Sequence, residues 1–225
     1  STDKTRDIAK KFNAKVFNHP YVGYVEPARN FALQKAKGKW ILLLDADEVI
    51  NEFLLKKLIN LSKSDSYDYF RIPRQNVVFG KWIEHSNWWP DYQIRFFKKG
   101  SVEWDDAIHS IPITVGHGFD LPPEEKNALI HYNYESISQY IERLNRYTSI
   151  EAHALIENGY AIIPNDILQK PFAEFLTRFF ATNGYRDGFH GLVLALLQAV
   201  SMLVVYVKVW ESQKKQEQIS PKTLL

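Results

Sequence analysis

Apolar residues recur along this chain in two patterns. A spacing of three to four residues over 27–37, 52–63 and 136–158 predicts amphipathic helices, each with one face packed against a core. The unbroken apolar run 41–44 predicts a short strand covered on both faces, as in the middle of a parallel sheet. Because helices and strands alternate, the first part of the chain is predicted to form an α/β layer fold.

The end of the chain follows a different pattern. Residues 172–182 are amphipathic and contain four Phe, whereas residues 192–207 carry no charged side chain. A helix that crosses a bilayer needs about twenty apolar residues, so three outcomes stay open: the second segment crosses a membrane, lies in its interface, or packs in a protein core. Since several Lys residues follow it, as on a cytoplasmic flank, we expect membrane contact through 189–210.

Two prolines mark the expected boundary between these parts. Pro164 and Pro171 are predicted to bracket a linker, because proline interrupts regular structure. The sequence therefore predicts one α/β domain over residues 1–160 and a C-terminal helical, membrane-associated extension over residues 161–225.

A group of carboxylates follows the apolar run 41–44 directly. Asp45 and Asp47 are separated only by Ala46, and Glu48 comes next. Ligands of open α/β sheets bind beyond the carboxyl ends of the strands, and Mg²⁺ takes one or two carboxylates together with phosphate oxygens and water. Asp45 and Asp47 are therefore candidate metal ligands. The alternative is an acidic turn that merely closes a strand.

Composition narrows the classes of partner. Lys and Arg number 28 against 26 Asp and Glu, a net charge of +2, and this balance argues against nucleic acid as the main partner. With no Cys, the chain can form neither a disulfide nor a thiolate metal site, which fits a reducing compartment. No glycine-rich dinucleotide fingerprint or P-loop is present, and this argues against those two nucleotide-binding classes.

Arg29 and Asn30 fall in the first turn of the helix predicted over 27–37. The N–H groups at a helix N-terminus favour anions, so these two side chains are candidates for phosphate contact. A surface salt bridge at Arg29 is the alternative.

Five short motifs together carry a family resemblance. They are, in chain order, Ser1-Thr-Asp-Lys-Thr5, Ala28-Arg-Asn30, Leu44-Asp-Ala-Asp-Glu48, Trp89-Pro-Asp-Tyr-Gln-Ile-Arg95 and His131-Tyr-Asn-Tyr134. This set resembles a family 2 glycosyltransferase of the GT-A fold, and most closely the WaaE-like subgroup of lipopolysaccharide core glucosyltransferases. The likeness covers nearly the whole chain.

The resemblance implies an inverting transfer of a sugar from a nucleotide diphosphate donor, typically UDP-linked, to an acceptor hydroxyl. It implies that Asp45 and Asp47 hold Mg²⁺ or Mn²⁺ on the diphosphate and that Asp91 is the catalytic base, the alternative for Asp91 being a helix cap after Pro90. The residues expected to contact the donor are Arg29, Asn30, Asp45, Arg95 and His109.

Trp88 and Trp89 are expected to form a stacking wall for the acceptor sugar, with core packing as the alternative.

Two departures from the family pattern stand out. The chain begins after the first strand and acidic turn that hold the nucleoside base in the family, so it is expected to lack its N-terminus and to bind donor weakly. Ser110 also occupies the position where relatives carry Glu. His109 is expected either to touch the diphosphate or to be a buried imidazole.

These observations favour a glycosyltransferase that acts on a lipid-linked or lipopolysaccharide-type glycan at the cytoplasmic side of the inner membrane, held there peripherally or by a single span. A metal-dependent nucleotidyltransferase and an inactive module that binds a glycan or a membrane remain as alternatives. The sequence leaves open the sugar, the acceptor and the linkage.

Overall fold

The computed structural model describes residues 3–20, 26–104 and 112–219. They form two compact units. The first unit comprises Ser1–Leu43, Ser62–Arg71 and Ile94–Phe119, and the second comprises Leu44–Leu61, Ile72–Gln93 and Asp120–Leu225. The strands β3 (Tyr69–Val78) and β5 (Asp91–Lys98) each begin in one unit and end in the other.

The first unit combines short helices and strands. Its further elements are α1 (Thr5–Lys11), α2 (Glu26–Lys35), β1 (Trp40–Leu42), β6 (Val102–Glu103), β7 (Ile113–Thr114) and most of β8 (Gly118–Asp120). Strand β1 pairs antiparallel with β5, and β6 pairs antiparallel with β7. Ile41, Phe97, Val102 and Trp104 form its buried core. The Trp40 ring stacks on Phe96 at a centroid distance of 4.7 Å.

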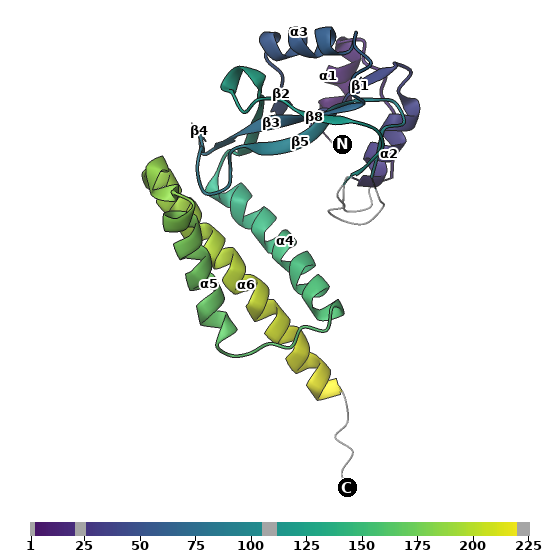
Figure 1. Cartoon of the computed structure of the whole chain (residues 1–225). Helices are drawn as coiled ribbons and strands as arrows, with labels where there is room; N and C mark the ends of the chain where they lie inside the picture. Colours follow the sequence, from purple (N-terminus) through teal and green to yellow (C-terminus); the bar gives the residue numbers. More distant parts are fainter. Residues whose placement is uncertain (1–2, 21–25, 105–111, 220–225) are drawn as a thin grey trace. The chain divides into compact units, whose positions relative to one another are not determined.

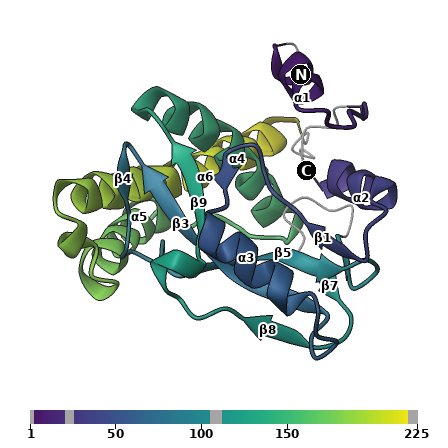
Figure 2. The ribbon, with the colours of Figure 1, turned by 90° about the horizontal axis from the view of Figure 1, so that it is seen from above.

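The strands of the second unit place polar residues in one row. Its further elements before the long helices are β2 (Glu48–Val49), α3 (Glu52–Leu61), β4 (Lys81–Trp82), the 3-10 helix η1 (Glu125–Asn127) and β9 (Leu129–Tyr134). Strand β9 lies between β3, to which it is parallel, and β2, to which it is antiparallel. Figure 2 shows β9 beside β3. Because His131 is level with Asn76 on one side and with Glu48 on the other, three strands contribute to a single row.

Three helices complete the second unit. They are α4 (Ile137–Glu157), α5 (Asp166–Leu176) and α6 (Phe189–Ile219), with the short helical segments η2 (Thr177–Ala181) and η3 (Gly184–Asp187) between the last two. Helix α6 packs against both α4 and α5 (Figure 1). Ser136 caps α4 by accepting a hydrogen bond from the Gln139 N–H, and side chains at every fourth position of α4 are buried, namely Tyr140, Leu144, Thr148 and Ala152.

Helix α6 is long and apolar enough to cross a membrane. The most apolar 18-residue window within Phe189–Gln216 has a mean hydropathy of 2.2, and 28% of that window is buried within the protein. Length and composition alone are weak evidence for a span, because core helices can satisfy the same criteria.

The structure corrects three local predictions. The run 41–44 does not form a strand covered on both faces in a parallel sheet: β1 is antiparallel to β5, the described pairings are mixed, and Leu44 is 37% exposed. A short apolar run does not specify strand direction or the number of covered faces. The helix predicted over 27–37 is present as α2, but it begins at Glu26 and ends at Lys35. Pro171 lies inside α5 rather than in a linker, so the helix forgoes one backbone hydrogen bond there.

Candidate active site

The acidic residues after β1 form a tight turn that is closed by its own hydrogen bonds. The Glu48 N–H donates to the Asp45 carbonyl at 3.0 Å, and the Asp45 N–H donates to Oε2 of Glu48 at 3.1 Å. Strand β9 fixes the turn from the other side, because the Tyr132 N–H donates to the Asp47 carbonyl at 2.9 Å. The Glu48 side chain is fully buried, whereas those of Asp45 and Asp47 are partly exposed.

Arg74 connects this turn with Asp91. Its Nη1 lies 3.2 Å from Oε1 of Glu48, while its Nη2 and Nε lie 2.6 and 2.8 Å from Oδ2 of Asp91. Arg74 and Asn76 are two residues apart on β3, so their side chains share one face of the strand. Asn76 also reaches Asp91, donating from Nδ2 to Oδ2 at 3.0 Å.

A second route runs from Asp91 to Asp47 through Asn76 and His131. Because Asn76 Nδ2 donates to Asp91 and to the Trp88 carbonyl, its Oδ1 is the acceptor that faces His131. His131 Nδ1 therefore donates to this oxygen, at 2.6 Å, and His131 Nε2 lies 3.5 Å from Oδ2 of Asp47. Asp47 and Asp91 thus belong to one continuous polar network within the second unit.

The charge state of Asp91 is set by competing effects. Burial acts to raise the pKa of Asp91, but the Arg74 charge and hydrogen bonds from Asn76, Arg74 and Gln93 together lower it below the usual value of 3.8. Asp91 is therefore an ionised carboxylate at neutral pH, and its side chain remains 24% exposed.

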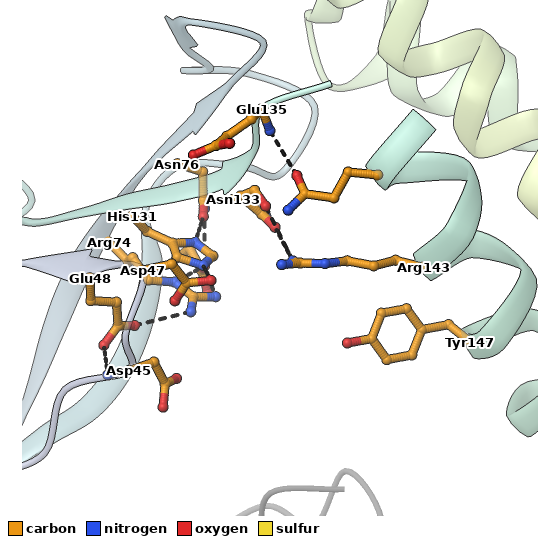
Figure 3. A network of polar contacts seen from close by, with 12 residues as sticks. Asp45, Asp47, Glu48, Arg74, Asn76, His131, Asn133, Glu135, Arg143 and Tyr147 are labelled. Carbon is orange, nitrogen blue, oxygen red and sulfur yellow. Dashed lines mark hydrogen bonds and ion pairs between the residues drawn. The ribbon is translucent and has the colours of Figure 1, made fainter. Parts of the chain in front are cut away.

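Asp47 is also held in its ionised form. The hydrogen bond with His131 lowers the pKa of Asp47, and the charges of His131 and Arg143 add to this effect, which together outweigh partial burial. Figure 3 shows Asp45 and Asp47 on the side of the turn that faces α4.

This turn suits a hard divalent cation in its chemistry. Mg²⁺ and Mn²⁺ prefer oxygen ligands, and Asp45 and Asp47 supply two carboxylates at one turn. No group of three or more His, Asp or Glu side chains that could hold a metal ion occurs in the described part of the chain. The turn fits a cation that takes its other ligands from phosphate and water.

Helix α4 supplies the side chains opposite the turn. Arg143 and Tyr147 are four residues apart, on one face of the helix, and Figure 3 shows both extending toward the acidic turn. Arg143 Nη1 donates to the carbonyl oxygen of Asn133 at 3.2 Å, and its guanidinium lies over the Tyr134 ring at 5.2 Å from the centroid.

Three predicted donor contacts lie in the first unit. The Asn30 side chain donates to the Trp104 carbonyl at 2.6 Å and accepts from the Trp104 N–H at 3.1 Å. The Arg29 guanidinium lies 5.6 Å from the centroid of the Trp104 ring, and Arg95 is buried. His109 and Ser110 lie outside the described residues. Of the predicted site residues, Asp45, Asp47 and Asp91 are the ones brought together around the network.

The two adjacent tryptophans have different surroundings. Trp88 packs against the buried cluster that contains Val78, Ile83 and Leu194, as in the core-packing alternative. Trp89 makes an edge contact with Trp82, with ring centroids 5.2 Å apart and planes at 85°. Both indoles are partly buried, so a stacking role for either remains a prediction.

Sequence reasoning gave no role to several members of the network, namely Arg74, Asn76, His131 and Arg143. Arg74 and Asn76 are two positions apart on β3, a spacing that places two polar groups on one face of the strand. Their partners come from distant segments, however, and only the strand register reveals them.

The sequence also matches a known family. Residues 1–116 of the 225 match the model described as "Glycosyl transferase family 2". Together with the α/β fold, this match defines the protein as a glycosyltransferase with a GT-A fold, as predicted. The chain belongs to glycosyl transferase family 2.

Several curated relatives are similar over most of their length. An uncharacterized glycosyltransferase of Rickettsia typhi is 26% identical over 97% of this chain and 78% of its own, and one of Rickettsia bellii is 27% identical over 94% and 74%. The lipopolysaccharide core biosynthesis glycosyltransferase LpsC of Rhizobium meliloti is 22% identical over 94% of this chain and 80% of its own.

Solved structures of TarS from S. aureus are also similar. The crystal structure of TarS residues 1–349 in complex with UDP has a TM-score of 0.43 and 17% sequence identity, covering 100% of this chain and 82% of the TarS chain. The complex with UDP-GlcNAc has a TM-score of 0.36 and 16% identity, covering 100% and 83%.

Proposed function

We propose that this glycosyltransferase moves a sugar, with inversion, from a nucleotide diphosphate donor to a hydroxyl of a lipopolysaccharide-type or lipid-linked glycan, and that UDP carries the sugar. The observation that carries the proposal is the network that joins the turn of Asp45 and Asp47 to Asp91 in a chain of this family. The name of the LpsC relative supports the class of acceptor.

In this reaction Asp91 accepts the proton of the acceptor hydroxyl. The freed oxygen attacks the anomeric carbon of the donor, and the bond from that carbon to the diphosphate breaks with its electron pair on the diphosphate. Because Arg74 and Asn76 hold Oδ2 of Asp91, the carboxylate keeps a fixed orientation and Oδ1, which accepts from Gln93 at 2.8 Å, is the oxygen proposed to take the proton.

Asp45 and Asp47 would hold Mg²⁺ or Mn²⁺, which offsets the negative charge of the diphosphate. His131 orients Asp47 and is itself oriented by Asn76. Arg29, Asn30, Arg95 and His109 as donor contacts, and Trp88 and Trp89 as acceptor contacts, belong to the same proposal. The Asn30 amide would have to serve the donor in addition to the backbone at Trp104.

Contact with the cytoplasmic side of the inner membrane through 189–210 is also part of the proposal. It is supported by the apolar composition of α6 and by its large exposed side chains, which are Phe189, Leu196, Val200, Val207 and Trp210.

Product analysis tests the reaction. The full-length protein is incubated with UDP-sugars, Mn²⁺ and a lipopolysaccharide core acceptor, and the nucleotide products are separated. Release of UDP that depends on the acceptor supports sugar transfer. Release of pyrophosphate in a parallel incubation with UTP and a sugar 1-phosphate would identify the alternative nucleotidyltransferase. The Asp91→Asn variant should bind UDP as the wild type does and release it far more slowly; equal turnover would remove Asp91 from the role of base.

A further inference from the structure

Helix α4 brings an arginine toward the acidic turn that the reaction as described above does not use. Arg143 and Tyr147 extend from one face of α4 toward Asp45 and Asp47 (Figure 3). A neighbouring face, about 100° around the same helix, is buried and contacts α6 through Leu144 and Thr148. Packing of the buried face therefore fixes the direction in which Arg143 points.

The guanidinium of Arg143 is held in a defined position. One nitrogen, Nη1, donates to the Asn133 carbonyl at 3.2 Å, and the guanidinium lies over the Tyr134 ring, 5.2 Å from its centroid. Arginine carries five N–H donors, so an arginine held by these two residues retains donors for an anionic oxygen. This anchoring lowers the conformational entropy that binding would otherwise cost.

The charge balance explains why such a group is needed. Within the network, Arg74 is already paired with Glu48 and Asp91. A divalent cation held by two carboxylates has no net charge left to offset a diphosphate. The leaving diphosphate gains a further negative charge when its bond to the sugar breaks, so a preorganised cation on its far side stabilises the transition state.

Arg143 extends into the space beside the turn. Figure 3 shows its guanidinium on the side of α4 that faces Asp45 and Asp47. A diphosphate held at this turn would therefore face Arg143.

We infer that Arg143 binds a phosphate oxygen of the donor diphosphate, on the side opposite Asp47, and stabilises the nucleoside diphosphate as it leaves. This inference rests on the proposed function, and it adds to it a donor ligand from α4.

Binding of UDP and of uridine, each in the presence of Mn²⁺, tests the inference by calorimetry on the full-length protein. Uridine lacks the diphosphate, so the ratio of the two affinities isolates the phosphate contacts. Arg143→Met should weaken UDP binding about 10- to 100-fold and leave uridine binding unchanged. Arg143→Lys, which keeps the charge without the planar fork, should give an intermediate loss.

Arg146→Met is the matched control, because it removes the same charge from an exposed position of the same helix. It should retain the wild-type ratio of affinities. Equal loss in both variants would show a general effect of charge and would overturn the assignment to Arg143.

The remaining outcomes separate this inference from the proposed function. If the wild type binds UDP no more tightly than uridine, the donor site itself is wrong and the proposed function fails. If the wild type prefers UDP and Arg143→Met keeps that preference, Arg143 only anchors α4 to β9 and the inference alone fails. A fall in thermal stability with an unchanged ratio of affinities would lead to the same conclusion.

Discussion

The polar network around Asp47 and the helices α5 and α6 differ in whether their side chains find partners within the protein. In the network, buried charges meet opposite charges, as Arg74 does with Glu48 and Asp91. Along α5 and the following η2, a stripe of apolar side chains at every fourth position is exposed, formed by Leu168, Phe172, Leu176 and Phe180. The polar groups of the network thus have their partners within the protein. The helices expose apolar surface of the kind that marks a site of membrane or protein contact.

The largest expected effect is a loss of turnover on substitution of Asp91. Asp91→Asn removes the carboxylate that is proposed to take the proton but keeps an oxygen for Arg74 and Asn76, so the turnover number should fall roughly 10²- to 10⁴-fold. Steady-state kinetics with UDP release as the readout measures it. A variant that binds UDP less tightly in proportion to its lost turnover would place Asp91 in donor binding instead.

The next effect concerns stability. Arg74→Met leaves the fully buried carboxylate of Glu48 without its cationic partner, and breaking such a pair typically costs about 3–5 kcal/mol in the free energy of unfolding. Denaturant unfolding measures this loss.

Lys56→Met is the matched control for Arg74→Met, because the pair of Lys56 with Glu52 on α3 is exposed on both sides. Its free energy of unfolding should stay close to that of the wild type. Similar stabilities for the two variants would show that the network is no more important to the fold than a surface ion pair.

A smaller effect is expected at the exposed apolar stripe. If a bilayer covers α5 as well as α6, Phe172→Ser and Phe180→Ser should each weaken binding to anionic lipid vesicles roughly 10-fold, since each removes a side chain that membrane contact would bury. Vesicle flotation measures it. Phe53→Ser on α3, also exposed, is the control and should float as the wild type does. Failure of the wild type to float would contradict membrane contact.

The smallest effect is a dependence of stability on pH. The pKa values of Asp47 and Asp91 are lowered in the folded protein, so the unfolded chain binds more protons in the acidic range and stability increases with pH there. Their contribution is complete above the usual aspartate pKa of 3.8 and is lost as the pH falls below it toward the folded values.

Arg74→Met should reduce this dependence, because the Arg74 charge is a main cause that lowers the pKa of Asp91. Unfolding measured between pH 5 and pH 2, a range chosen around the usual aspartate pKa of about 4, compares the two proteins. Parallel curves would show that Asp91 is not linked to Arg74 in solution.

Sequence patterns anticipated the long helices better than the sheet. The segments 52–63 and 136–158 correspond closely to α3 and α4, because each repeats its apolar positions over several turns and has a capping residue, Asn51 or Ser136. The short strands carry too few residues to specify their direction, and this is why the antiparallel pairing of β1 was missed.

The candidate site could be anticipated only in part. Asp45 and Asp47 stand out because acids follow an apolar run, and Asp91 stood out only through the family resemblance. Arg74 and His131 enter the site because β9 lies between β3 and β2 at one register, and a single sequence does not reveal the register of distant strands.

The most direct test of the central claim is whether the acidic turn binds a metal ion together with a nucleotide. Electron paramagnetic resonance of Mn²⁺ in the presence of the full-length protein shows the free ion as a sharp signal, which decreases when the ion is bound. We predict that UDP strongly decreases this signal with the wild type, beyond its effect on Mn²⁺ without protein, and that Asp47→Asn abolishes the extra decrease. The same decrease with Asp47→Asn as with the wild type would contradict the account.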